Sequence, residues 1–335
     1  MTPYVRRLDD PACRDPREFG GKAAGLAALA GLGVAVPPGF VLGAAAYRAF
    51  LGSGDLRAAV DAGRPAAELA RLAAVTPVPA AVADAVRDAY AALGGPSPVP
   101  VAVRSSATAE DGAAASFAGG FESWLDVTGP DAVVAHVHRC WQAVFAPRVG
   151  DYARAGGGHP AAIEMAVVVQ RVVRARAAGV MFTVSPVTGD RSRIVVEASW
   201  GLGLAVVGGE VTPDRWVVDK VGLEIVGFEA GDKRIEYRHG GAATPVEPAR
   251  RSVPCLTDGQ VLALAGLGKR LERAQGAPQD VEFVVGEGAD AGPVLVQCRP
   301  ETVWSNRPRP PRFTGGDPAA WLGEAVGLLP GGPAR

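Results

Sequence analysis

The chain has 335 residues, of which 48% are hydrophobic, so it can bury a substantial core and is expected to be globular. Its 34 Lys and Arg residues stand against 35 Asp and Glu residues, which gives a formal net charge of -1. This balance excludes the basic surface of a nucleic-acid-binding protein and a polybasic membrane anchor. Any phosphate group that the chain binds must therefore be held by locally placed donors.

The cysteines and the N-terminus indicate a compartment. The four cysteines lie far apart and form no CxxC pair, which argues against a disulfide scaffold and a zinc knuckle. The N-terminus has no apolar run of signal-peptide length, and no window reaches the roughly 18 to 20 apolar residues of a membrane helix. These features predict a soluble, cytoplasmic protein.

A glycine-rich turn, Phe19-Gly20-Gly21-Lys22, precedes an Ala- and Leu-rich segment that stops at 31–33. The pattern predicts a helix whose N-terminal end carries Lys22. Residues 34–51 predict a short strand and a helix, and residues 56–94 predict two more helices separated by Thr-Pro-Val-Pro. The GGK sequence alone is also compatible with an ordinary turn, because it lacks the GxxxxGK[ST] spacing of a P-loop.

The apolar run 99–103 predicts a strand that breaks into a polar loop beginning at Arg104, and strand-end loops are where α/β folds place ligand contacts. A small-residue segment at 116–120 follows, then a strand at 122–127 and a long helix over about 130–155. Taken singly, the Arg-Ser-Ser sequence is also compatible with a capped turn, and the glycines with a tight bend.

Apolar runs in the second half predict buried strands at 166–173, 179–184, 194–200 and 214–220. A helix over 258–274 precedes a last strand pair, 281–285 and 294–298. This mixture predicts an α+β (α/β) fold with two sheets. The chain becomes linker-like after Thr302, and a short amphipathic stretch follows.

Three of these segments together meet the needs of a polyphosphate site. Such a site requires a lysine point charge, an arginine fork and small residues that let backbone N–H groups approach the phosphates. The candidates are Lys22, Arg104, and Ser116, Gly119 and Gly120 of the small-residue segment.

The last strand pair carries polar residues at alternate positions. Period two places Asp280 and Glu282 on one face of the first strand, and Gln297 and Arg299 on one face of the second. A carboxylate and an amide oxygen that face each other suit Mg²⁺, and Arg299 could stabilise a transferring phosphoryl group. A solvated hairpin with a surface ion pair is the alternative interpretation.

Nine segments follow one another in a characteristic order: FGGKAAGLAAL, PPGFVL, VAVRSSATAED, SFAGG, VVVQRVV, GVMFTVSPVTGD, EASWGLGLAVVGGEVTPDRWVV, PQDVEF and VQCRPET. Their order and spacing over about residues 18–303 resemble the N-terminal nucleotide domain of the phosphoenolpyruvate synthase and pyruvate phosphate dikinase family. Rifampicin phosphotransferase and phenylphosphate synthase belong to the same family. The resemblance implies a two-lobed, ATP-grasp-like fold with lobes at 1–170 and 171–303 and a Pro/Gly-rich tail at 304–335.

The resemblance also implies ligands, ATP and Mg²⁺, and a role for each candidate residue. It implies that ATP is bound by Lys22 and Arg104 at the phosphates, Gln170 at the hinge near adenine, Glu197 near the ribose or adenine, Glu282 and Gln297 through Mg²⁺, and Arg299 at the transferring group. Lys22, Arg104 and Arg299 are then the catalytic residues. Gly120, Leu204 and Gly208 stand where the family often has Gln, Glu and Ser, which bears on substrate detail and turnover.

Full-length relatives carry the phosphate onward through a swivelling histidine domain, which this sequence is expected to lack. His159, in GGGHPAAIEM, precedes the 166–173 strand and is interpreted as a loop or helix-cap residue. We therefore expect the β-phosphate to pass to a histidine of a separate partner protein, leaving AMP. The alternatives are a direct small-molecule kinase that makes ADP, a non-catalytic ATP-sensing module and, more distantly, an ATP-grasp ligase.

Overall fold

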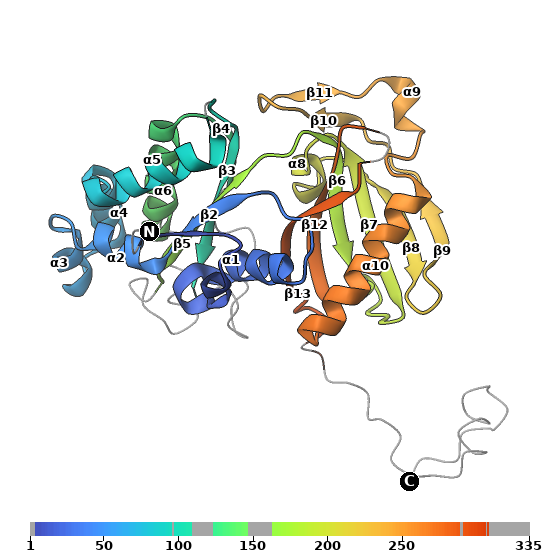
Figure 1. Ribbon diagram of the computed structural model, residues 1–335, viewed down its shortest axis with the longest axis horizontal. Helices are drawn as coiled ribbons and strands as arrows, with labels where there is room; N and C mark the ends of the chain where they lie inside the picture. The colour runs from blue at the N-terminus through green and yellow to red at the C-terminus, as the bar shows by residue number, and fades with distance from the viewer. Residues whose placement is uncertain are drawn as a thin grey trace, which may run out of the picture.

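The computed structural model describes residues 4–95, 97–108, 123–146, 163–288, 291–305 and 307. Ser116, Gly119, Gly120 and His159 lie outside the described residues. Two large antiparallel sheets with helices packed on them make up most of the described chain (Figure 1), which confirms the expected mixture of helices and strands.

The first sheet has the strand order β1-β2-β5-β3-β4, and all its neighbouring strands are antiparallel. Its strands are β1 (Val5–Arg7), β2 (Gly39–Leu42), β3 (Val101–Ala107), β4 (Ser123–Val127) and β5 (Met165–Arg171). In the central strand β5, Val167 and Val169 face one hydrophobic cluster while Ala166 and Val168 face another. Burial on both faces explains why the sequence of β5 is apolar without alternation.

Five helices supply the first of these clusters: α2 (Ala44–Leu51), α3 (Leu56–Asp61), α4 (Ala66–Val75), α5 (Ala80–Gly94) and α6 (Pro130–Gln142). Residues 56–94 thus form three helices where two were expected, because Gly63, with φ of 64°, separates α3 from α4. The helix expected over 130–155 is also wrong in length. It gives way to a 3₁₀ turn at Ala143–Phe145, and Ala146 is extended, as the residue before a proline prefers to be.

The second sheet has the order β13-β12-β6-β7-β8-β9, again antiparallel throughout. Its strands are β6 (Ala175–Phe182), β7 (Arg193–Trp200), β8 (Asp214–Asp219), β9 (Glu224–Glu229), β12 (Gln279–Gly286) and β13 (Pro293–Pro300). Helix α10 (Asp258–Gln275), which starts at a Thr257 capping box, covers one face and joins a cluster with Met181, Val196 and Trp216. The other face of the sheet carries most of its polar side chains.

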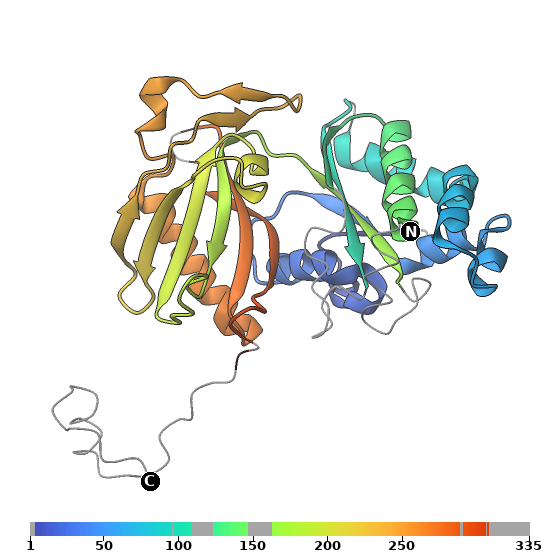
Figure 2. The same ribbon diagram turned by 180° about the vertical axis from the view of Figure 1, so that it is seen from behind.

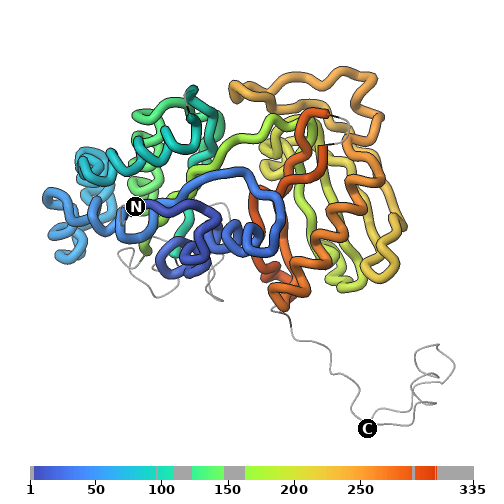
Figure 3. Tube along the Cα trace, viewed as in Figure 1, coloured from blue at the N-terminus to red at the C-terminus, as the bar shows by residue number. Residues whose placement is uncertain are grey.

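The two sheets are joined in two ways. Residues 172–174 connect β5 directly to β6, a passage that is visible from behind in Figure 2. Helix α1 (Pro16–Gly31), near the start of the chain, packs beside the edge strand β13, which is the last strand of the chain (Figure 3). The contact is close, since a Cβ atom on Gly25 would lie 2.1 Å from the carbonyl oxygen of Cys298.

Several small elements were not expected from the sequence. They are a 3₁₀ turn at Pro11–Arg14, the edge strands β1 and β9, the short helices α8 (Leu204–Val207) and α9 (Pro248–Arg251), and a hairpin of β10 (Ile235–Tyr237) and β11 (Ala243–Pro245). Residues 301–305, expected to lead into a linker, form a turn in which the buried Glu301 carboxylate accepts the N–H groups of Val303, Trp304 and Ser305. Trp304 also donates from Nε1 to the Pro186 carbonyl, so this turn is anchored to the second sheet's loops.

Within the described ranges, no single helix is long and apolar enough to cross a membrane. Helices α4 and α5 would pass such a test only as a pair, by length and composition, and they are bent by 65° at the break between them.

Candidate functional site

Lys22 lies just after a break in helix α1. The helix begins at Pro16 with Asp15 as its N-cap, so one helical turn precedes the glycines that were expected to lead into it. Gly20 then takes φ of 73° and ψ of 165°, outside the helical region and in a conformation that glycine tolerates. The helical segment that carries Lys22 therefore starts anew at Gly21, inside the element.

Arg104 lies within β3, and the expected polar loop at this point is wrong. The strand continues because Ser105 and Ser106 pair with Val167 and Ala166 of β5, which satisfies their backbone groups in the ladder. Small, fully buried serines can occupy such positions, and a polar sequence alone did not reveal that they were covered.

The Arg104 side chain crosses from the first sheet to the second. Its Nη2 donates to Glu282 Oε2 at 2.6 Å, and its Nη1 donates to the Val296 carbonyl at 2.9 Å. Val296 is the extra residue of a β-bulge opposite Glu282 and Phe283, a feature that often lies beside functional sites. The Arg104 Nε is buried and has no hydrogen-bond partner within the described residues, so one N–H group of this guanidinium is without an acceptor there.

The strand pair β12–β13 brings together the residues expected there. Glu282 stands directly opposite Gln297, and Asp280 directly opposite Arg299, all on one face. Arg299 contacts the Asp280 carboxylate through Nε at 2.8 Å and Nη2 at 2.6 Å. Burial raises the pKa of Asp280 above its ordinary value, and Arg299 offsets this only in part.

Glu197 belongs to the same row of side chains. The row runs across the sheet through Gln297, Glu282, Val180, Glu197, Arg215 and Glu229. Glu197 and Glu282 are thus two strands apart, or about 10 Å, on a face that α10 does not cover. Burial raises the pKa of Glu197, and Arg215, 3.5 Å from its carboxylate, acts in the opposite direction.

Gln170 shares a face of the first sheet with Arg104. It stands opposite Ala102 in the pairing of β5 with β3, and alternation then places Arg104 and Ser106 successively further along the same face. Gln170 is buried and donates from Nε2 to the Pro37 carbonyl at 3.3 Å. Along this face of the first sheet the order is therefore Gln170 of β5 at the end near the β5–β6 connection, Arg104 of β3 in the middle, and Ser106 of β3 beside helix α1.

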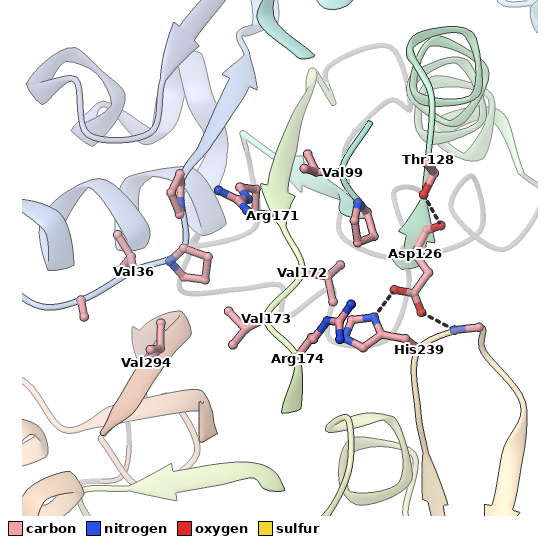
Figure 4. Close-up of a pocket in the computed structure, with 15 residues that line it drawn as sticks. Val36, Val99, Asp126, Thr128, Arg171, Val172, Val173, Arg174, His239 and Val294 are labelled. Atoms are coloured by element: carbon pink, nitrogen blue, oxygen red, sulfur yellow. Dashed lines mark hydrogen bonds and ion pairs between the residues drawn. The ribbon is translucent and has the colours of Figure 1, made fainter. Parts of the chain in front are cut away.

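A cavity of about 870 Å³ surrounds the connection between the two sheets (Figure 4). Its lining includes Arg171 at the end of β5, residues 172–174 of the connection, residues 35–38 before β2, and Val294 of β13. None of Lys22, Arg104, Glu197, Glu282, Gln297 and Arg299 lines it. The cavity thus adjoins the first sheet at the Gln170 end, while the charged candidate residues lie further along the two sheets.

One wall of this cavity is formed by contacts of Asp126 with His239 and Gly240, called the clasp below, which the sequence did not suggest. Asp126, at the end of β4, accepts from the backbone N–H of Gly240 at 3.0 Å and lies 2.7 Å from His239 Nδ1 (Figure 4). His239 and Gly240 are in the β10–β11 loop. Asp126 has a positive φ of 58°, which Asp tolerates better than most residues. The carboxylate therefore joins the first sheet to the hairpin beside the second.

The residues present fit a magnesium ion that is shared with a polyphosphate. In the part of the chain that the structure describes, no group of three or more His, Cys, Asp and Glu residues could hold a metal ion. Glu282 and Gln297 nevertheless offer two oxygen donors from opposed positions. Mg²⁺ commonly takes only one or two carboxylate-type ligands from a protein and the rest from phosphates and water.

Residues 17–314 match the family model described as pyruvate phosphate dikinase, AMP/ATP-binding domain. The chain belongs to this family. Its segments 18–303, recognised by their order, fall within the matched residues, so the sequence resemblance is confirmed.

Three curated relatives support the membership of the chain in this family. The chain is 38% identical over 321 residues to a probable phosphoenolpyruvate synthase of Methanothermobacter thermautotrophicus, a match that covers 90% of the chain and 46% of the relative. It is 39% identical over 338 residues to phosphoenolpyruvate synthase of Aeropyrum pernix, covering 86% and 41%. It is 40% identical over 311 residues to rifampicin phosphotransferase of a Streptomyces species, covering 88% and 35%. The chain spans less than half the length of these relatives.

Two of the three departures from the family pattern are described. Leu204 begins α8 and is 36% exposed, and Gly208 ends it. A Cβ atom on Gly208 would lie 2.9 Å from the Leu204 carbonyl, so the space for the usual serine is narrow. Gly120 lies outside the described residues with the rest of the phosphate segment.

Three of the four histidines are described, and each has a partner elsewhere. His138 Nε2 lies 3.0 Å from the Ala73 carbonyl, and His136 Nδ1 lies 2.7 Å from the Ala132 carbonyl. His239 belongs to the clasp. Among the described histidines, none contacts Arg104 or Glu282.

Proposed function

We propose that this AMP/ATP-binding domain transfers the β-phosphoryl group of Mg·ATP to a histidine of a separate partner protein, leaving AMP. The observation that carries the proposal is the contact of Arg104 with Glu282, with Gln297 directly opposite Glu282. A cation from the first sheet and two oxygen donors from the second sheet meet there, and this combination suits a magnesium-bound polyphosphate.

We further propose a two-lobed, ATP-grasp-like arrangement with lobes at 1–170 and 171–303 and a tail at 304–335. ATP would lie between the sheets, with its adenine near Gln170 and the cavity around the connection. Its phosphates would lie further along β3, near Arg104 and α1. The order of side chains on this face of the first sheet supports this direction, since Arg104 and Ser106 follow Gln170 toward α1.

The remaining residues have separate proposed tasks. Lys22 and Arg104 would bind the phosphates, and Glu197 would contact the ribose or adenine from the open face of the second sheet. Glu282 and Gln297 would hold Mg²⁺, which neutralises phosphate charge. Arg299, held by Asp280 in this structure, would stabilise negative charge on the transferring group.

The partner is part of the proposal. The relatives named phosphoenolpyruvate synthase and rifampicin phosphotransferase are much longer than the matched domain. Because the described histidines have partners away from Arg104 and Glu282, we propose that the acceptor histidine is supplied by another polypeptide. The protein's work is then positioning and charge stabilisation, with the nucleophile coming from outside.

The test is to resolve the nucleotides formed from Mg·ATP by the purified chain, alone and with a candidate histidine-domain protein. Glu282→Gln is the blank. Glu229→Gln is the matched control, because Glu229 lies on the same row of the same sheet but its side chain is 74% exposed.

Partner-dependent AMP that Glu282→Gln abolishes and Glu229→Gln retains would support the proposal. Partner-independent ADP would replace it with a direct kinase acting on a small molecule. ATP that binds but stays intact in every mixture would indicate a sensing module.

A further inference from the structure

The break in helix α1 is filled by a side chain from β3. In an unbroken helix the Ala23 N–H would donate to the Phe19 carbonyl, four residues earlier. Here the hydroxyl of Ser106 lies between these two groups. It donates to the Phe19 carbonyl at 3.0 Å and accepts from the Ala23 N–H at 3.4 Å. A side chain inserted into the helical ladder is a recognised cause of such a break.

Gly20 and Ser106 fit each other. A Cβ atom on Gly20 would lie 2.3 Å from both the carbonyl oxygen and the Oγ of Ser106. The positive φ of Gly20 turns the chain there, and the absence of a side chain lets β3 approach. Ser106 itself is fully buried, so water cannot replace its hydroxyl without rearrangement.

The bridged segment contains Lys22. Ser106 is two residues from Arg104 on the same face of β3. Its hydroxyl therefore ties residues 19–23, the turn that contains Lys22 and is called the Lys22 turn below, to the strand that carries Arg104. We propose that Ser106 is a positioning residue that holds Lys22 at a set place relative to Arg104. The consequence for ATP phosphates rests on the proposed function, whereas the placement of the turn does not.

The experiment is a double-mutant cycle on Mg·ATP affinity with Ser106→Ala, Lys22→Met and the double variant. If Ser106 acts through Lys22, Ser106→Ala should weaken binding by about tenfold in the unaltered background and have little further effect beside Lys22→Met. An equal loss of Mg·ATP affinity in the unaltered and Lys22→Met backgrounds would overturn the proposal. It would mean that the Ser106 hydroxyl affects binding independently of Lys22, by stabilising the fold in general. Ser105→Ala is the matched control, being an equally buried serine whose side chain points to the opposite face of β3.

Amide hydrogen exchange without nucleotide separates this inference from the proposed function. Ser106→Ala should speed exchange over residues 19–24 by about tenfold or more, whereas Ser105→Ala should not. Unchanged exchange in Ser106→Ala would overturn the positioning role. If the unaltered chain failed to bind Mg·ATP while exchange changed as expected, the proposed function would fall and Ser106 would remain the residue that places the Lys22 turn.

Discussion

Arg104 Nη2 lies 2.6 Å from Glu282 Oε2, and this contact joins β3 of the first sheet to β12 of the second. The two residues are 178 positions apart in the chain. Both side chains are largely buried, with 14% and 21% exposed, so solvent screens the pair less than it would a surface pair.

Replacing Arg104 should destabilise the folded chain. Arg104→Ala leaves the Glu282 carboxylate and the Val296 carbonyl without their donor, and we expect a loss of about 1 to 3 kcal/mol in the free energy of unfolding by urea. Arg87→Ala, at an exposed arginine paired with Asp84 and Asp131, should change it by less than about 1 kcal/mol. Equal losses in the two variants would contradict a special role for the contact between the sheets.

Glu197 should impose a pH dependence on stability. Its folded-state pKa is raised by burial, so the folded chain keeps this proton to a higher pH than the unfolded chain, whose glutamate titrates near the ordinary value of 4.5. The contribution of Glu197 is therefore largest below pH 4.5 and is lost as the pH rises through the higher folded-state value. The difference in unfolding free energy, unaltered chain minus Glu197→Gln, should therefore decrease as the pH rises from 4.5 to the folded-state pKa of Glu197.

Urea unfolding at a series of pH values measures this difference. Glu224→Gln, at an exposed position of β9, is the reference substitution. A difference for Glu197→Gln that is flat or rises with pH would show that Arg215, rather than burial, dominates the carboxylate.

Two helical glycines should respond in opposite ways to substitution by alanine, because only one of them, Gly25 of α1, packs against β13. Gly25→Ala forces a Cβ against the Cys298 carbonyl and should destabilise the chain by about 1 to 3 kcal/mol. Gly266→Ala, in α10 with nothing within 4 Å of the added atom, should stabilise it by about 0.5 to 1 kcal/mol. Thermal unfolding of both variants checks the signs, and a neutral Gly25→Ala would mean that α1 can move away from β13 at little cost.

The clasp predicts local loosening without loss of the fold. Asp126→Ala removes the acceptor for Gly240 N–H and the partner of His239, so exchange over residues 238–243 should quicken while stability falls by only about 1 kcal/mol. Asp126→Asn, which keeps an acceptor oxygen, should be milder. Asp61→Ala, at an exposed aspartate paired with Arg57, should leave hairpin exchange unchanged. Unchanged exchange in Asp126→Ala would show that other contacts hold the hairpin.

Prediction from sequence succeeded where a pattern depends on near neighbours. Alternation along a strand put Asp280 with Glu282 and Gln297 with Arg299, and the observed pairing of β12 with β13 confirms both assignments. The helix over 258–274 was predicted almost to its ends, because a capping threonine starts it and a glycine ends it. The ordered motifs identified the family for the same reason, since they are read along the chain.

Prediction failed where a distant segment decides local structure. Arg104, Ser105 and Ser106 have the composition of a loop, yet β5 pairs with them and keeps them in a strand. The clasp from Asp126 to His239 likewise joins residues 113 positions apart that no local pattern relates.

The amino-acid sequence alone determined the periodicity of strands and helices, because periodicity depends on positions a few residues apart. It also determined the family, because the family is identified from the order of motifs along the chain. The tertiary structure alone decided that Arg104 reaches Glu282, that Glu197 shares their row, and that Ser106 fills the break beside Lys22. These relationships depend on which strands pair and on how a helix from the start of the chain packs against a strand from its end. Long-range packing sets such distances, and no local pattern encodes them.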